Sequence, residues 1–294
     1  MDMEKIKAFL SLSETESFTK SAEQLFISQP ALSKQIQTLE QELNIPLFNR
    51  TKKATTLTMY GTYFRPYAAA IWENYAKALD HIKQITNSEE GNLYVGATHF
   101  IGVYLLSPHL AQFQQLFPNI TMHATIDSSK TLLRKLEKYE LELAFLSDYV
   151  AIDEERFQRL PWMKDELKVA VGANHPFAGR TSITEEELAT DLFVTKEKYS
   201  SIYQFINSSR RHVVTEGKSL FIHDQEAIKQ VISTGRGFAL LSPKSVALEV
   251  AAGRIHLLDL EGYELKRNIT IVREKNRHIT PACKHLLELI LKEQ

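Results

Sequence analysis

Residues 28–43, SQPALSKQIQTLEQEL, restrict the fold of the N-terminal part more than any other stretch of the sequence. With an advance of about 100° per residue, the residues Leu32, Ile36 and Leu39 lie on one narrow stripe, which predicts a helix with one buried face. Ser28 suits the N-cap position, and the first turn of a helix tolerates proline. Opposite the stripe lies a polar face with a single charge, made of Pro30, Ser33, Lys34, Gln37 and Gln41.

This polar face has the composition of a DNA-binding surface. No acid occurs between Glu23 and Glu40, so no carboxylate on this face would repel a phosphate. Glutamine amides can read adenine edges, whereas hydroxyls and lysines suit phosphates. The DNA contacts that we expect from this helix are made by Ser28, Gln29, Pro30, Ser33, Lys34 and Gln37.

Two further helices and a basic wing complete the predicted N-terminal domain, residues 1–58. Residues 3–15 and 17–27 have apolar side chains at helical spacing, and with residues 28–43 they predict a helix-turn-helix unit. Residues 45–58 are rich in turn- and strand-forming residues and predict a two-stranded wing. A merely solvated face is the ordinary interpretation of one polar helix. The combination favours DNA binding instead, because the acid-free residues 43–72 contain Arg50, Lys52, Lys53 and Arg65.

Residues 8–61 resemble the N-terminal domain of LysR-type transcriptional regulators. The matching positions are Ser17, Phe18, Ala22, Leu25, Ser28, Gln29, Pro30, Ala31, Leu32, Ser33, Ile36, Leu39, Glu40, Leu47, Phe48, Arg50, Leu57, Thr58 and Gly61. The chain length fits this family from end to end. The resemblance implies a DNA-binding transcriptional regulator whose C-terminal domain senses a small metabolite.

Residues 59–89 predict a long linker helix. Apolar residues recur every seven positions in two series offset by three, which is typical of a short coiled coil. The resemblance implies that this helix pairs two subunits of a homodimer, which can assemble further into a homotetramer. An ordinary helix packed on its own domain is the alternative, and Pro66 is expected to kink the helix. The expected dimer contacts are Phe64, Ala68, Ile71, Tyr75, Ala78 and Ile82.

Residues 90–294 alternate short apolar strands with helical stretches, which predicts a parallel sheet built from βαβ units. The resemblance implies a two-lobed α/β effector domain similar to periplasmic binding proteins. Lobe I would comprise about residues 90–161 and 266–294, and lobe II about residues 162–265. The chain would then cross between the lobes near Pro161 and near Leu265.

Polar residues that directly follow strands are the candidates for the effector site, because ligands bind at the carboxyl ends of parallel strands. A hydroxyl at such a position is more often a helix cap than a ligand contact. Hydroxyls, helix N-termini and Lys196 together favour a small anion, either a carboxylate or an inorganic oxyanion. The expected effector contacts are Thr98, His99, Ser128, Thr195, Lys196, His223 and Phe238.

Composition excludes several other classes of protein. The formal net charge is −1, so DNA binding must come from local charge. Cys283 is the single cysteine, which excludes an intrachain disulfide and favours a reducing compartment and a small buried role. No stretch approaches the ~18 apolar residues of a membrane span. We therefore expect a cytoplasmic protein.

The sequence lacks the signatures of an enzyme. The histidines have no metal-ligand spacing, and neither a Gly-x-Ser-x-Gly elbow nor a Cys-x-x-Cys pair occurs. We expect neither a metal nor a cofactor other than the effector. The favoured function is thus a LysR-type regulator controlled by a small anionic effector. The alternative is a cytoplasmic two-lobed solute-binding protein, or a small-molecule enzyme, whose N-terminal helices serve only assembly.

Overall fold

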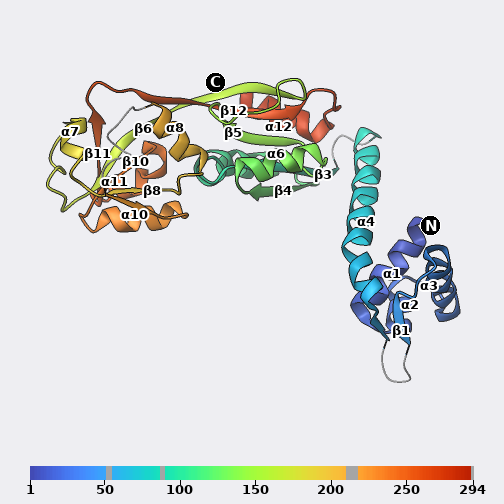
Figure 1. Cartoon of the computed structure of the whole chain (residues 1–294). Helices are drawn as coiled ribbons and strands as arrows, with labels where there is room; N and C mark the ends of the chain where they lie inside the picture. The colour runs from blue at the N-terminus through green and yellow to red at the C-terminus, as the bar shows by residue number, and fades with distance from the viewer. Residues whose placement is uncertain (51–54, 87–89, 210–217, 293–294) are drawn as a thin grey trace. The chain divides into compact units, whose positions relative to one another are not determined.

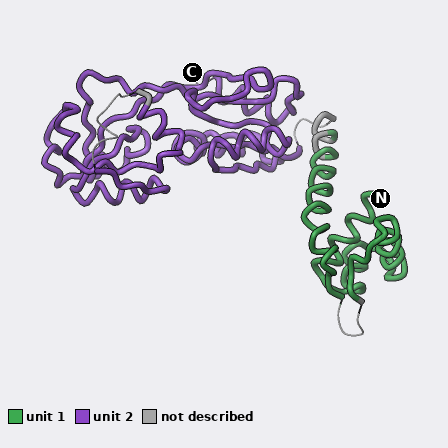
Figure 2. The backbone as a smooth tube through the Cα atoms, viewed as in Figure 1, with its two compact units in different colours: residues 1–86 green, residues 87–294 purple. Residues whose placement is uncertain are grey.

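The computed structural model describes residues 1–50, 55–86, 90–209 and 218–292. The chain forms two compact units, residues 1–86 and 87–294, which we call the N-terminal and C-terminal units (Figure 2). The linker helix is part of the N-terminal unit, and the predicted boundary after residue 58 lies within this unit and stays a prediction. Lys52 and Lys53 lie outside the described residues.

The N-terminal unit is a winged helix-turn-helix followed by one long helix (Figure 1). Asp2, Ser17 and Ser28 each accept a backbone N–H bond as N-cap of the first three helices. The two wing strands pair antiparallel, as predicted. The elements are α1 (Met3–Thr15), α2 (Phe18–Gln24), α3 (Gln29–Leu43), β1 (Phe48–Arg50), β2 (Thr55–Leu57) and α4 (Met59–Thr86).

A small apolar core holds the three helices together, with Phe9 of α1 and Leu32 and Ile36 of α3 fully buried in it. Glu40 fixes the wing to α3, because its Oε1 accepts hydrogen bonds from the backbone N–H groups of Leu47 at 2.8 Å and of Phe48 at 3.0 Å. The predicted stripe on α3 therefore faces this core, and the opposite face of α3 is exposed.

Helix α4 packs its first turns on the same core. Ala68 is 0% exposed, and the ring of Phe64 lies 5.0 Å from the ring of Phe9. The assignment of Ala68 to a dimer contact was therefore wrong, because the domain's own core covers its side chain. Phe64 packs against this core but is half-buried, so its dimer contact stays a prediction. The helix also runs continuously through Pro66.

The C-terminal unit is an α/β structure with one long mixed sheet. The strands lie in the order β4-β3-β5-β12-β6-β10-β8-β9, and β11 pairs with β6 and β7. Strands β3, β4 and β5 are parallel to one another, and so are β8, β9 and β10, which confirms the predicted βαβ arrangement. The elements are β3 (Gly91–Ala97), η1 (Ile101–Leu106, a π-helix), α5 (Ser107–Leu116), β4 (Ile120–Ile126), α6 (Ser129–Glu137), β5 (Leu143–Ser147), β6 (Phe157–Gly172), β7 (Ser182–Ile183), α7 (Glu185–Leu188), β8 (Phe193–Thr195), α8 (Ser201–Ser209), β9 (Ser219–Phe221), α10 (Gln225–Ser233), β10 (Phe238–Leu241), η2 (Pro243–Ser245, a 3-10 helix), α11 (Ala247–Ala251), β11 (Ile255–Leu260), β12 (Leu265–Glu274) and α12 (Pro281–Lys292).

Strands β6 and β12 connect the two lobes. Residues 157–167 of β6 pair antiparallel with β12, whereas residues 168–172 pair with β10 and β11 of lobe II. Strand β6 thus changes partners after Leu167, farther along the chain than the crossover expected near Pro161. Strand β12 begins at Leu265, at the position of the second expected crossover.

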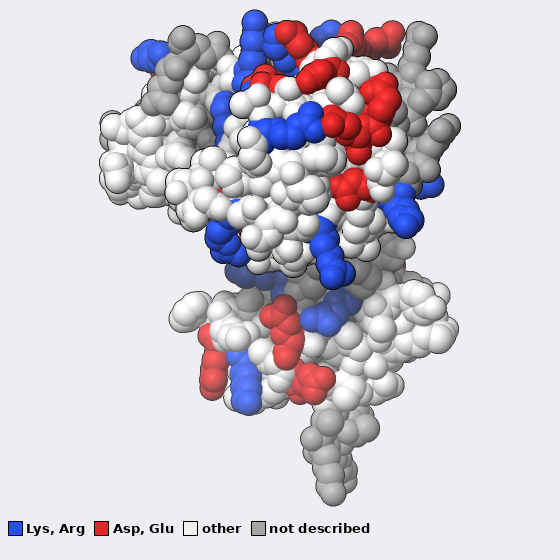
Figure 3. Space-filling view, turned by 90° about the vertical axis from the view of Figure 1, so that its left-hand side faces the viewer, with Lys and Arg blue, Asp and Glu red and all other residues white. Residues whose placement is uncertain are grey.

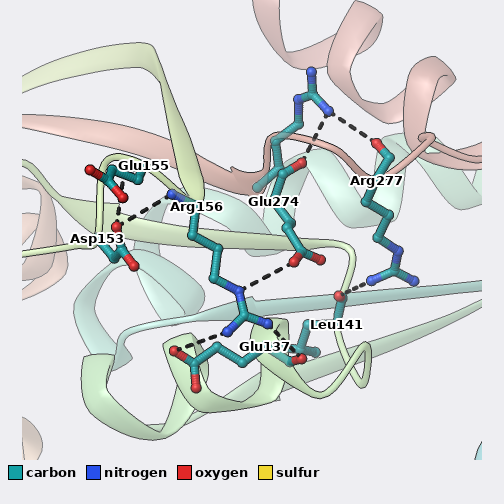
Figure 4. A network of polar contacts seen from close by, with 8 residues as sticks. Glu137, Leu141, Asp153, Glu155, Arg156, Glu274 and Arg277 are labelled. Carbon is teal, nitrogen blue, oxygen red and sulfur yellow. Dashed lines mark hydrogen bonds and ion pairs between the residues drawn. The ribbon is translucent and has the colours of Figure 1, made fainter.

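An arginine network closes the end of lobe I that lies opposite the carboxyl ends of its parallel strands (Figure 4). The Nε of Arg156 donates to Glu274 Oε1 at 3.2 Å, and a terminal nitrogen of Arg156 donates to the backbone carbonyl of Glu137 at 3.0 Å. Arg277 donates to the backbone carbonyl of Leu141 at 2.6 Å. The end of α6 and the end of β12 are thereby held together.

Gly61 provides a test of the packing of α4. A Cβ at this position would lie 2.2 Å from the carbonyl oxygen of Leu47 and 2.8 Å from Leu57 Cδ2. We expect Gly61→Ala to lower the free energy of unfolding by about 1–3 kcal/mol, because backbone atoms must move. Urea unfolding of the full chain measures this change.

Gly179→Ala is the matched control, because a Cβ there meets nothing within 4 Å. We expect this control to change the free energy of unfolding by less than about 1 kcal/mol. Equal effects of the two substitutions would show that α4 does not need this close approach.

Candidate effector cavity and DNA-binding surface

A cavity of about 630 Å³ lies between the two lobes of the C-terminal unit, at the carboxyl ends of the parallel strands. This volume is suitable for a small metabolite. The polar lining comes from both lobes and consists of Thr98, His99, Asp127, Ser128, Ser129, Lys130, Ser147, Tyr149, Thr195, Lys196, Glu197, Tyr199, Ser200, Ser201, His223, Asp224, Gln225, Ser242 and Arg267.

Most of the expected effector residues meet in this cavity. Those that line it are Thr98, His99, Ser128, Thr195, Lys196 and His223. Phe238 does not, and its assignment was wrong. Its side chain is buried in the core of lobe II, where its ring stacks on Phe193 at 5.2 Å, and the later β10 residues Leu240 and Leu241 line the cavity instead.

Sequence reasoning missed the buried ion pair beside the cavity. Arg267 of β12, which lines the cavity, donates two hydrogen bonds to Asp165 Oδ2 of β6, from Nε at 2.7 Å and from a terminal nitrogen at 2.6 Å. Ser242 donates to the other oxygen of Asp165 at 2.6 Å. Arg267 and Asp165 are directly opposite in the strand register, so only the pairing of β6 with β12 could have revealed them.

The cavity lining carries three cations. Arg267 pairs with Asp165, Lys130 is exposed, and Lys196 is half-buried. Burial lowers the pKa of its amine, and in the described part of the chain no hydrogen bond or ion pair reaches that amine. The charges of Asp224 and Glu197 partly offset the effect of burial on this pKa, but neither carboxylate forms an ion pair with the amine. Asp127 accepts from the backbone N–H of Ser128, Glu197 lies 3.4 Å from His223 Nδ1, and Asp224 caps α10.

His99 offers a second unused polar group. Burial, followed by the charge of Lys196, lowers the pKa of its imidazole, which favours the neutral form. Its Nδ1 is buried and has no hydrogen-bond partner among the described residues, while its Nε2 lies 3.9 Å from Asp224 Oδ2. A buried nitrogen without a partner is costly, so a ligand group that reaches it would be stabilised.

Side chains from the two lobes contact each other at two places. Tyr104 of η1 donates a hydrogen bond to Glu226 of α10, and Lys229 of α10 contacts Glu226 at 2.8 Å. Elsewhere on the lining, Tyr149 stacks on Phe205 of α8 with ring centroids 4.5 Å apart. These contacts connect lobe I with lobe II directly.

The N-terminal unit presents the expected polar face on α3. Along this face Gln29, Lys34 and Gln37 are exposed, and Ser33 is half-buried. Arg50 belongs to strand β1 of the wing. In the view of Figure 3, Lys and Arg side chains and Asp and Glu side chains both occur on the surface, separated by uncharged residues. The acid-free stretch between Glu23 and Glu40 is therefore a local feature of this chain.

Cys283 packs in the core of lobe I, where burial raises the pKa of its thiol well above the usual value. Within the described ranges, no cluster of three or more His, Cys, Asp or Glu side chains is arranged to bind a metal ion. The helices of those ranges are also too short or too polar to cross a membrane.

Two family models match the chain. The LysR substrate-binding domain matches residues 86–294, and the bacterial regulatory helix-turn-helix protein of the LysR family matches residues 3–62. The chain belongs to the LysR family of transcriptional regulators. This membership decides between the two functions that the sequence left open, because a LysR-type regulator uses its N-terminal helices to bind DNA.

Similar proteins support this assignment over the whole chain. A "Probable RuBisCO transcriptional regulator" of Thalassiosira pseudonana is 32% identical over 295 residues, which cover 95% of this chain and 94% of the relative. The structure of full-length CbnR with its target DNA has a TM-score of 0.69 at 18% identity, with all of both chains covered. The effector-binding domain of QuiR in complex with shikimate has a TM-score of 0.60 at 22% identity, covering 69% of this LysR-type chain and 97% of that domain.

Proposed function

We propose that this LysR-type regulator is controlled by a small anionic effector that binds in the cavity between the lobes. The observation that carries the proposal is the amine of Lys196, which is half-buried in the cavity and, among the described residues, makes no hydrogen bond or ion pair. A charge without a counterion in such a site favours an anionic ligand. QuiR, which has the same fold, was solved with shikimate, a hydroxylated carboxylate.

The other cavity residues complete a site for an oxygen-rich anion. Thr98 follows β3 and Ser128 caps α6, so hydroxyls stand beside a helix N-terminus, where anions are stabilised. Thr195 and His223 contribute from lobe II, and His99 provides the free Nδ1. An effector that touches both lobes would favour one lobe arrangement over another and could thereby change DNA binding.

The exposed face of α3 is the proposed DNA-binding surface. Its N-terminal residues would enter the major groove, as in other helix-turn-helix proteins. Gln29 and Gln37 would read bases, while Ser28, Pro30, Ser33 and Lys34 would position the helix on the backbone. Arg50, Lys52 and Lys53 would bind phosphates from the wing. Such a protein works in the cytoplasm, where the DNA is.

Gln29→Ala tests this surface. The variant should lose about 1–3 kcal/mol of binding free energy for a duplex that the wild type selects from a random pool. The reason is that the hydrogen bonds between the Gln29 amide and an adenine are removed. Its binding to an unselected duplex should not change. Fluorescence titration with both duplexes at fixed salt measures the two affinities.

Gln41→Ala is the matched control, since Gln41 is an exposed glutamine near the C-terminal end of the same helix. It should leave both affinities unchanged. If Gln29→Ala weakens both duplexes equally, Gln29 does not read a base.

We also propose that α4 pairs two copies of the chain into a homodimer, from which a homotetramer can form. Ala68 is buried in the core and half-buried Phe64 packs against it, and beyond them a largely exposed apolar stripe continues along this helix. It contains Tyr67, Ile71, Tyr75, Ala78 and Ile82, of which Ile71 is half-buried. Monomeric proteins rarely leave such a stripe uncovered.

Ile82→Asp tests this pairing, because Ile82 is 60% exposed and its replacement removes little from the N-terminal unit itself. A carboxylate in an apolar seam should give monomers in sedimentation equilibrium at concentrations where the wild type is dimeric. Ala76→Asp adds the same charge at an exposed position of α4 outside the stripe and should stay dimeric. Two equally dimeric variants would locate the interface elsewhere.

Lys196→Met tests the anionic effector. Calorimetry with hydroxylated carboxylates such as shikimate, with phosphate and with neutral sugars should identify an anion that binds the wild type. Lys196→Met should weaken that binding by about 1.5–3 kcal/mol, because a charge-assisted hydrogen bond is lost. Lys198→Met should not, since Lys198 does not line the cavity. A neutral ligand that binds both variants and the wild type equally would contradict the proposal.

A further inference from the structure

Phe26, in the turn between α2 and α3, is the most exposed large apolar side chain in the described ranges. It is 96% exposed and belongs to no apolar cluster of the N-terminal unit. Across the same ranges, its ring also has no aromatic or cationic neighbour. The ring therefore adds nothing to the packing of its own domain.

The backbone at Phe26 is strained for an aromatic residue. Its φ is 55°, in the left-handed region that favours glycine. The conformation is imposed by the end of α2, where the N–H of Phe26 donates to the carbonyl of Glu23 at 3.1 Å and that of Ile27 donates to the carbonyl of Ala22 at 3.0 Å. These two bonds form a Schellman motif, whose left-handed position is usually glycine or asparagine.

Tyr139 provides a useful comparison, because it occupies the same position after α6. Its φ is 58°, and the same two backbone bonds close that helix. The ring of Tyr139, however, lies 5.1 Å from the guanidinium of Arg277, so it has a partner within the fold. Phe26 combines strain with exposure and has no such partner, a combination that is typical of functional positions.

The surroundings of Phe26 indicate what its ring could meet. Phe26 is two residues before Ser28, the exposed N-cap of α3, while Ile27 between them packs against the core. The acid-free residues 24–39 include Phe26 and most of α3. The start of a recognition helix lies in the major groove, where thymine methyl groups and deoxyribose rings are the apolar surfaces.

We propose that Phe26 is a DNA-contacting residue whose ring packs on apolar surface of the duplex beside the start of α3. The proposal rests on the proposed role of α3 as the recognition helix. Because the ring is uncharged, it contributes affinity without neutralising a phosphate, so it does not affect the salt dependence of binding. Phe26 would thus add an apolar contact to a surface otherwise made of amides, hydroxyls and lysines.

Phe26→Asn separates the effect of the ring on DNA binding from the effect of the strained backbone on folding, because asparagine tolerates the left-handed conformation but has no ring. The full-length variant should bind the duplex selected by the wild type about tenfold more weakly. The slope of log K against log salt concentration should not change. Amide hydrogen exchange in α2 and α3 should be as slow as in the wild type or slower, because strain is relieved.

Two further variants serve as controls. Phe26→Leu keeps an apolar side chain and should retain more of the affinity than Phe26→Asn. Tyr139→Asn relieves the same backbone conformation in the C-terminal unit and should not change DNA binding.

A duplex with uracil in place of thymine identifies the contacted surface. Wild-type binding falls if the ring meets methyl groups, and stays constant if it meets deoxyribose, and in both cases Phe26→Asn must bind the thymine duplex more weakly.

Three results with Phe26→Asn would overturn the proposal. The first is a DNA affinity equal to that of the wild type, and the second is a changed slope of log K against log salt concentration. The third is a loss of affinity together with faster amide exchange in α2 and α3, which would assign Phe26 a role in folding. The proposed role of α3 as the recognition helix is tested separately, because it predicts that Gln29→Ala weakens binding to the selected duplex alone.

Discussion

The antiparallel pairing of β6 with β12 supports the whole C-terminal unit. Each strand contributes side chains to the cores of both lobes, and the pairing continues from Phe157 opposite Glu274 to Leu167 opposite Leu265. Asp165 and Arg267 face each other within this ribbon and are buried. Removing one partner of a buried ion pair typically costs about 3–5 kcal/mol. The ribbon is therefore both the connection between the lobes and a fixed part of the cavity that lies between them.

The contacts across the cavity show how a ligand could act on this ribbon. Tyr104 reaches Glu226, and Tyr149 stacks on Phe205, so side chains of the two lobes contact each other. An effector cannot shift an equilibrium unless it binds the two arrangements differently. A ligand that bridges Lys196 and His99, which come from different lobes, would meet that requirement.

Local signals in the sequence were sufficient to predict the helices and the wing of the N-terminal unit. They were insufficient to predict contacts between residues far apart in the chain. The caps and apolar stripes of α1 to α3 are set by residues three or four positions apart, so they could be predicted. The heptad pattern of α4 could not show that Ala68 packs on its own domain, because both arrangements need the same apolar spacing. Phe238 was misassigned because every residue of β10 is buried, which leaves no alternation to distinguish the cavity side. Arg267 and Asp165 are 102 residues apart, and only the strand register brings them together.

Helix α4 has a mechanical consequence for any signal that reaches it. Its first turns pack on the core of the winged helix-turn-helix through Gly61, Phe64 and Ala68, so α4 and α3 belong to one compact unit. A straight helix of 28 residues is about 42 Å long at the usual rise per residue. It can act as a rigid lever, because a tilt of about 5° about its C-terminal end displaces its N-terminal end, which packs beside α3, by about 4 Å. This is close to the spacing of successive base pairs in DNA. A small rotation of this arm could therefore move α3 from one base-pair step to the next.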